Sequence, residues 1–153
     1  MAAQAHQKRK TQEKTAPRTN GLKMQEKNIP DVIKKIGFDF HWSEEKVWKL
    51  SIPVTEMPIE ELTWHFNIPF HWHEGGVYNL KSIDIINNPK KYKQEYERTM
   101  KADLKYPIDI MENKGRWLIL DGLHRLMKSY VLKMKKVKVR IIPRDKIAQI
   151  IKN

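Results

Sequence analysis

The sequence predicts an α/β protein of the α+β type, a single compact domain with a small mixed sheet and flanking helices. At 153 residues the chain is long enough for one domain with a sizeable core. Residues 106–142 show strand, turn, strand, helix and strand patterns in succession. The strand at residues 118–120 is apolar on both faces, so we expect both sides of the sheet to be covered.

Short elements are predicted in the first half of the chain. Residues 30–36 form a predicted helix, because a proline suits its first turn and a glycine follows its end. Three alternating aromatic residues come next and fit either a short strand or an apolar clip: Phe38, Phe40 and Trp42. Residues 45–53 are predicted as a strand and residues 59–65 as a short helix.

The middle of the chain is predicted to be irregular and then helical. Residues 69–74 fit an aromatic loop or a short strand, and the glycine pair at 75–76 is a flexible break. Residues 81–86 fit one helical turn. A longer helix is expected to run from Asn88, its cap, to about Ala102, with a proline in its first position.

The last third has the strongest pattern. Strands are predicted at residues 106–110 and 116–120, joined by a hairpin turn at residues 113–115. A helix follows from Leu123, since apolar residues recur there at helical spacing: Leu123, Leu126, Met127, Tyr130, Val131 and Met134. Residues 137–142 form the final predicted strand.

The boundary between the strand at 116–120 and this helix is the main candidate site. We call residues 121–125 the helix-start motif. A helix N-terminus suits an anion, and Gly122 allows close backbone approach. Gly122, Leu123, His124 and Arg125 are therefore predicted to bind phosphate. Asp121, His124 and Arg125 are predicted catalytic residues, since a carboxylate, an imidazole and a guanidinium suit phosphate chemistry.

Asp103 completes the predicted catalytic set; it lies at the junction just before the first motif strand, and Asp109 lies within that strand. Either carboxylate could hold Mg²⁺ or accept a hydroxyl proton. Simpler roles are also open. Asp103 fits a helix-end turn, Asp121 a turn or cap, and Arg125 a solvated charge opposite the apolar stripe.

The segment from about Pro107 to Pro143 resembles the ParB/sulfiredoxin superfamily, also called the ParB-like nuclease fold. The resemblance rests on the helix-start motif in its strand–turn–helix–strand context. In that superfamily a Gly-x-x-Arg or Gly-x-His-Arg element grips nucleotide phosphates. Members include CTP-binding partition proteins, sulfiredoxins, a free-serine kinase, ATPases and nucleases. The resemblance thus implies an ATPase or phosphotransferase that binds ATP, ADP or CTP, with Mg²⁺ as a possible cofactor.

Departures from the family narrow this expectation. The chain has no cysteine, and Leu123 stands where sulfiredoxins carry their catalytic thiol, so sulfinic-acid reduction is excluded. Only about ten residues follow Pro143, too few for the helix-turn-helix of partition proteins, so plasmid partition is not expected. The free-serine kinase has a closer motif. Glu60 or Glu61 could correspond to its catalytic glutamate.

Charge suggests a second class of partner. Residues 1–28 contain seven Lys and Arg against two Glu, a net +5 of the chain's +12, which leaves +7 on the remainder. We predict a disordered basic tail at 1–28 and a ParB/sulfiredoxin-like domain at 29–153. The tail could contact nucleic acid, as in a ParB-like nuclease or DNA-associated protein, or it could be a plain extension. A basic cluster is also predicted behind the motif helix: Lys133, Lys135, Lys136, Lys138, Arg140 and Arg144.

A second group of chemical residues is His65, His71, His73 and Glu74. Imidazole and carboxylate ligands could bind a transition metal, but the spacing matches no known motif, so no metal ligand is assigned. The other interpretation is an aromatic loop that forms a pocket wall opposite the motif helix. His65 or His71 would then be a candidate general base.

Composition excludes several other classes. Without cysteine there are no disulfides and no thiol catalysis. No run of 18 apolar residues and no secretory signal is present, so we expect a cytoplasmic protein without a membrane partner. Three functions stay open: a nucleotide hydrolase or phosphotransferase, a nuclease or DNA-associated protein, and a non-catalytic nucleotide-sensing module.

Overall fold

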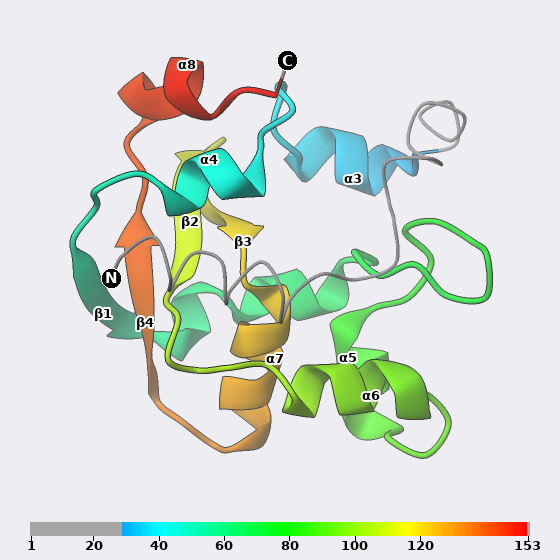
Figure 1. Ribbon diagram of the computed structural model, residues 1–153. Helices are drawn as coiled ribbons and strands as arrows, with labels where there is room; N and C mark the ends of the chain where they lie inside the picture. Colours follow the sequence, from blue (N-terminus) through cyan, green and yellow to red (C-terminus); the bar gives the residue numbers. More distant parts are fainter. Residues whose placement is uncertain (1–28, 153) are drawn as a thin grey trace.

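A computed structural model describes residues 29–152, and the predicted basic tail at 1–28 lies outside this part of the chain. The domain is built on a four-stranded sheet with the strand order β1-β4-β2-β3 (Figure 1). Its strands are β1 Val54–Pro58, β2 Ile108–Asn113, β3 Arg116–Asp121 and β4 Lys136–Ile141. β1 pairs antiparallel with β4, and β3 pairs antiparallel with β2. The two central strands, β4 and β2, are parallel to each other. The predicted α+β fold with a small mixed sheet is therefore confirmed.

Short helices surround the sheet. The α-helices are α3 Asp31–Ile36, α4 Glu44–Trp48, α5 Ser82–Asn87, α6 Lys93–Met100, α7 Leu123–Val131 and α8 Ile147–Ile150. The 3₁₀ helices are η2 Ile59–Glu61, η3 Thr63–Asn67 and η4 Arg144–Lys146. None of the helices between residues 29 and 152 is long and apolar enough to cross a membrane.

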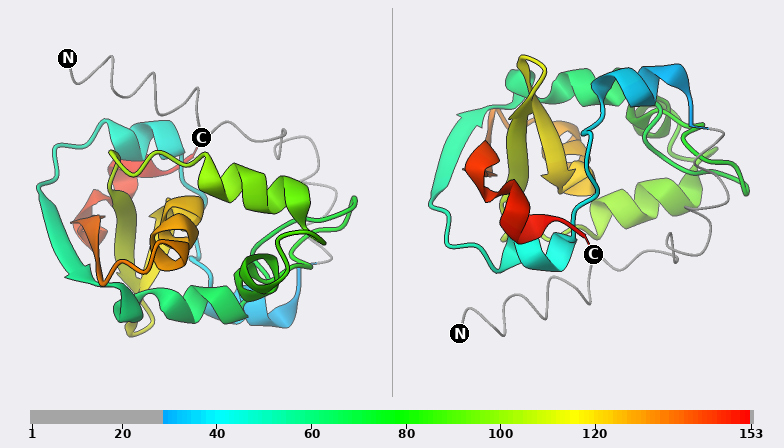
Figure 2. Two further views of the ribbon diagram at one scale, coloured as in Figure 1. Left: turned by 90° about the horizontal axis from the view of Figure 1, so that it is seen from below. Right: turned by 90° about the horizontal axis from the view of Figure 1, so that it is seen from above.

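Apolar side chains pack on both faces of the sheet. This was predicted from residues 118–120, which are apolar on both sides of the strand. Leu126 and Met127 of α7 pack with Ile110 and the 3₁₀ helices on one face. On the other face, Leu120 packs with residues of α4 and α8. Figure 2 shows the α7 side of the molecule from below and the α4 and α8 side from above. The boundary from β3 to α7 is consequently held between two cores.

The predicted strand at residues 45–53 is wrong, because α4 occupies Glu44–Trp48. Ser43 caps this helix: its side-chain oxygen accepts a hydrogen bond of 3.3 Å from the Lys46 N–H. The two glutamates of the first turn suit the positive end of the helix dipole. These helix-start signals outweigh the apolar spacing that predicted a strand. The first strand, β1, begins only after the helix, at Val54.

Other boundaries differ less. The helix predicted at 59–65 is present as η2 and η3. The helix predicted from Asn88 begins at Lys93, with Tyr92 at its N-cap position. The side-chain amide of Asn88 donates to the Asp84 carbonyl of the preceding helix. The aromatic residues at 38, 40 and 42 form the apolar clip, with ring centroids 5.1–6.1 Å apart. In the β2–β3 hairpin, Lys114 and Gly115 have φ of 54° and 82°, as expected for a type I′ turn.

Candidate functional site

The start of α7 joins an edge strand to a helix through one left-handed glycine. β3 ends at Asp121, Gly122 has φ 118° and ψ 23°, and α7 begins at Leu123 without a side-chain cap. A Cβ atom on Gly122 would lie 2.8 Å from Nη2 of Arg125. Glycine is thus required twice, for the backbone conformation and for the close approach of the guanidinium.

Arg125 is buried, so its simpler interpretation as a solvated charge opposite the apolar stripe is wrong. Its residue surface is only 1% exposed, and Nη2 lies 3.1 Å from Oδ2 of Asp121. The same carboxylate oxygen accepts a hydrogen bond of 2.7 Å from the indole N–H of Trp48. Side chains on a helix lean toward its N-terminus, which carries the guanidinium back over Gly122 into this ion pair.

The structure thus brings Asp121, Gly122, His124 and Arg125 together at one helix turn, with His124 half-buried. Trp48 joins them from α4, 73 residues away. Sequence reasoning missed Trp48, because no local pattern relates α4 to the end of β3.

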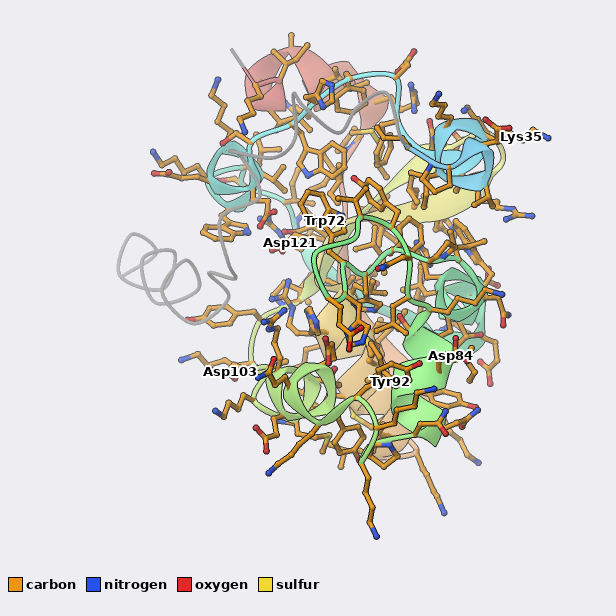
Figure 3. The ribbon with its side chains drawn as sticks, turned by 90° about the vertical axis from the view of Figure 1, so that its right-hand side faces the viewer. Lys35, Trp72, Asp84, Tyr92, Asp103 and Asp121 are labelled. Carbon is orange, nitrogen blue, oxygen red and sulfur yellow. The ribbon has the colours of Figure 1, made fainter. Side chains whose placement is uncertain are left out.

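Asp103 is not part of this cluster. Its Oδ1 accepts a 2.9 Å hydrogen bond from the Lys105 N–H, so it forms the turn after α6 that was its simpler interpretation. Figure 3 shows Asp103 well away from Asp121 on the same side of the molecule.

Asp109 serves the fold. Its side chain is fully buried and accepts a 2.6 Å hydrogen bond from Nε of Arg140. The other two guanidinium nitrogens of Arg140 donate to the carbonyls of Val47 and Leu50, each at 2.8 Å. This pair ties β2 and β4 to the end of α4, so Asp109 is engaged and is no candidate Mg²⁺ ligand.

The predicted basic cluster is smaller than expected, because two of its arginines bind elsewhere. Arg140 belongs to the buried pair, and Arg144 donates to the Glu112 carbonyl at 2.7 Å. The remaining members are exposed: Lys133, Lys135, Lys136 and Lys138.

His65 is a structural residue, which contradicts its candidacy as a general base. Its Nδ1 donates to the Leu62 carbonyl at 2.7 Å, and its Nε2 accepts from the Ile119 N–H at 3.1 Å. Burial lowers the pKa of His65 from 6.5 to about 4, so the ring is neutral. A buried neutral imidazole thereby links η3 to the edge strand β3.

We expect this histidine to make stability depend on pH. Because its folded pKa lies below the unfolded value, its contribution is complete above about pH 6.5 and is lost as the pH falls toward 4. Urea unfolding at pH 7.5 and 4.5 should show a decline in the free energy of unfolding. That decline should be larger in wild type than in His65→Gln, by on the order of 2 kcal/mol. The exposed-site control His41→Gln should follow wild type, and a parallel decline in His65→Gln would refute the assignment.

The loop that begins at His71 lies against the start of α7. The ring centroids of His71 and His124 are 5.4 Å apart. Nε2 of His71 lies 2.8 Å from Oγ of Ser82. His73 instead contacts Glu95 of α6 at 2.8 Å. Burial alone would raise the pKa of Glu95, but the hydrogen bond from His73 helps hold it below its usual value. The loop therefore packs against the first turn of the motif helix; that it forms the wall of a pocket stays a prediction.

The histidines of this region point to different partners. Within residues 29–152, no group of three or more histidine or carboxylate side chains is arranged to hold a metal ion. His71 stays a candidate general base, whereas His73 acts as an anchor between the loop and α6.

A cavity of about 250 Å³ lies along the other side of α7. Arg125 and Ser129 line it from the helix, and residues of β1, β2 and β4 line it from the sheet. Concave space is therefore present next to the buried guanidinium.

Comparison with known proteins adds no relative: no protein-family model, no curated protein and no solved structure matches the chain.

Proposed function

We propose that the start of α7 binds the phosphate groups of a nucleotide and that the protein is a nucleotide hydrolase or phosphotransferase with a ParB/sulfiredoxin-like pocket. One observation carries the proposal. An edge strand passes through a left-handed glycine into a helix that lacks a side-chain cap, with a buried arginine directly behind that glycine. Helix N-termini of this kind favour anions through their N–H groups and dipole.

The residues of the motif suit separate tasks in such a site. The first turn of α7 would donate backbone N–H groups to phosphate oxygens, and His124 would orient or protonate one of them. Arg125 adds positive potential behind Gly122, and Asp121 with Trp48 fixes its position. Because Arg125 is buried in an ion pair with Asp121, it would contact phosphate directly only if a ligand displaced Asp121. Without that displacement, Arg125 would hold Gly122 and the first turn of α7 in position. Mg²⁺, when bound with the nucleotide, would neutralise phosphate charge.

A second candidate is binding of a nucleic-acid phosphate by the same helix start. It is favoured by the chain's net charge of +12 and by the four exposed lysines behind α7. Plasmid nicking that is lost in His124→Ala would support this function over nucleotide hydrolysis.

The test of the main proposal is a thermal shift with ATP, ADP or CTP in the presence of Mg²⁺. At a nucleotide concentration about 100 times Kd we expect stabilisation by about 2.7 kcal/mol, which is a rise of several degrees in Tm. His124→Ala should reduce the rise, whereas His41→Ala, which removes an exposed histidine, should keep it. Phosphate release then distinguishes an enzyme from a nucleotide-sensing module. No shift with any of the three nucleotides would refute the proposal.

A further inference from the structure

The cavity beside α7 has the size of a small organic molecule. It is an open pocket bordered by α7, the start of β4 and the segment that leads into β2, and its volume is about 250 Å³. An apolar cavity of about 150 Å³ accommodates a benzene molecule, so this space admits one ring with a short chain. We propose that the cavity binds a small amphipathic anion, a carboxylate attached to a single aromatic ring or a short alkyl chain.

The walls favour a ligand with an apolar body. Their side chains are largely apolar: Leu104, Tyr106, Ile108, Met134 and Val137. Ile108 and Val137 are nearly fully buried in the main core, whereas Met134 is 41% exposed. The polar side chains of the wall are Glu56, Ser129 and three cationic residues, so the apolar part of the wall suits a ring or an alkyl chain while the polar part suits a charged head group. The exposed methionine is adaptable enough to close over a ligand.

The charges around the cavity favour an anionic head group. Three cationic residues line it, Arg125, Lys136 and Lys138, against one carboxylate, Glu56. Arg125 is paired with Asp121, and Lys138 lies opposite Glu56 in the β1–β4 register. Lys136 is exposed and takes part in none of the ion pairs found in the described part of the chain. Lys136 is therefore the residue assigned to the ligand carboxylate.

This site is separate from the one proposed for phosphate. It lies along the later turns of α7, as Ser129 in its wall shows, whereas the phosphate site is the first turn. Arg125 is the residue common to both. Variants of His124 and of Lys136 therefore test the two sites independently.

The experiment is a titration of the full chain with 3-phenylpropanoate, followed by methyl NMR signals of methionine, valine and isoleucine. We expect saturable shifts at Met134, Val137 and Ile108. Lys136→Met should weaken binding by roughly tenfold, as expected for the loss of a charge-assisted contact. Lys135→Met, which removes a neighbouring exposed lysine outside the cavity wall, should leave binding unchanged. The neutral amide of the probe should bind more weakly than the acid.

A second variant addresses the apolar part of the site. Val137→Phe should fill the cavity and abolish the shifts at Met134, provided that its spectrum stays folded; if it unfolds, the two lysine variants decide. His124→Ala should bind the probe as wild type does. Absence of methyl shifts at 10 mM probe would overturn the proposal, as would equal affinity for the neutral amide or equal losses in both lysine variants.

Discussion

Replacing Arg125 with alanine is expected to lower the free energy of unfolding by about 3–5 kcal/mol, the usual cost of removing one partner of a buried ion pair. The side chain of Asp121 is 9% exposed and would lose the guanidinium that pairs with its charge, while the Trp48 hydrogen bond would stay. The variant would also extend the adjoining cavity, because Arg125 forms part of its wall. Urea denaturation at pH 7.5 measures the loss.

A matched control separates this effect from that of removing any arginine. Arg98→Ala removes an exposed arginine from α6 and should change the free energy of unfolding by less than about 1 kcal/mol. An equally small change in Arg125→Ala would show that the buried pair does not stabilise the fold. Arg125→Ala is for the same reason a poor probe of phosphate binding, and His124→Ala is the better one.

Replacing Arg140 with alanine should be similarly costly, about 3–5 kcal/mol. Its guanidinium makes three hydrogen bonds of 2.6–2.8 Å, one to the buried Asp109 and two to carbonyls at the end of α4. Loss of the side chain removes the arginine that pairs with the fully buried carboxylate and takes one donor from each of two carbonyls. Urea denaturation monitored by tryptophan fluorescence would report the change, since Trp48 belongs to α4.

Two comparisons test the Arg140 prediction. Arg144→Ala removes a hydrogen bond of 2.7 Å to the Glu112 carbonyl near the surface and a long one of 3.5 Å to Asn113, and it should cost only about 1 kcal/mol. The double variant Asp109→Ala, Arg140→Ala should be destabilised by less than the sum of the single variants, because the two side chains interact directly. Additive losses would contradict the pairing.

The ion pairs Asp121–Arg125 and Asp109–Arg140 offset the same electrostatic repulsion. Asp109 and Asp121 lie opposite each other in the β2–β3 register, next to a shift in the pairing. Like charges at facing positions destabilise a sheet. Each aspartate has its own arginine, Arg140 from β4 and Arg125 from α7. The pairs thus allow two carboxylates at the end of the sheet where the candidate site lies.

Local sequence was sufficient for the elements with strong periodicity and clear end signals. The hairpin at residues 113–115, the final strand and the amphipathic helix after Gly122 were predicted because apolar spacing and turn residues agree there. The same reasoning failed at α4, where apolar spacing and capping signals disagreed and the cap prevailed. It also left the sheet order open, since strand pairing depends on contacts distant in sequence.

For the candidate site, local sequence was enough to predict which chemical groups meet at the start of α7, because Asp121, Gly122, His124 and Arg125 are neighbours along the chain. The use of these groups depends on the elements that pack around them. The tertiary structure turned Arg125 inward to a carboxylate, supplied Trp48 from α4, removed Asp103 to a separate turn and made His65 a neutral core residue. The reason is that burial and charge pairing are set by surrounding elements, and a local pattern contains no information about which of them will be near.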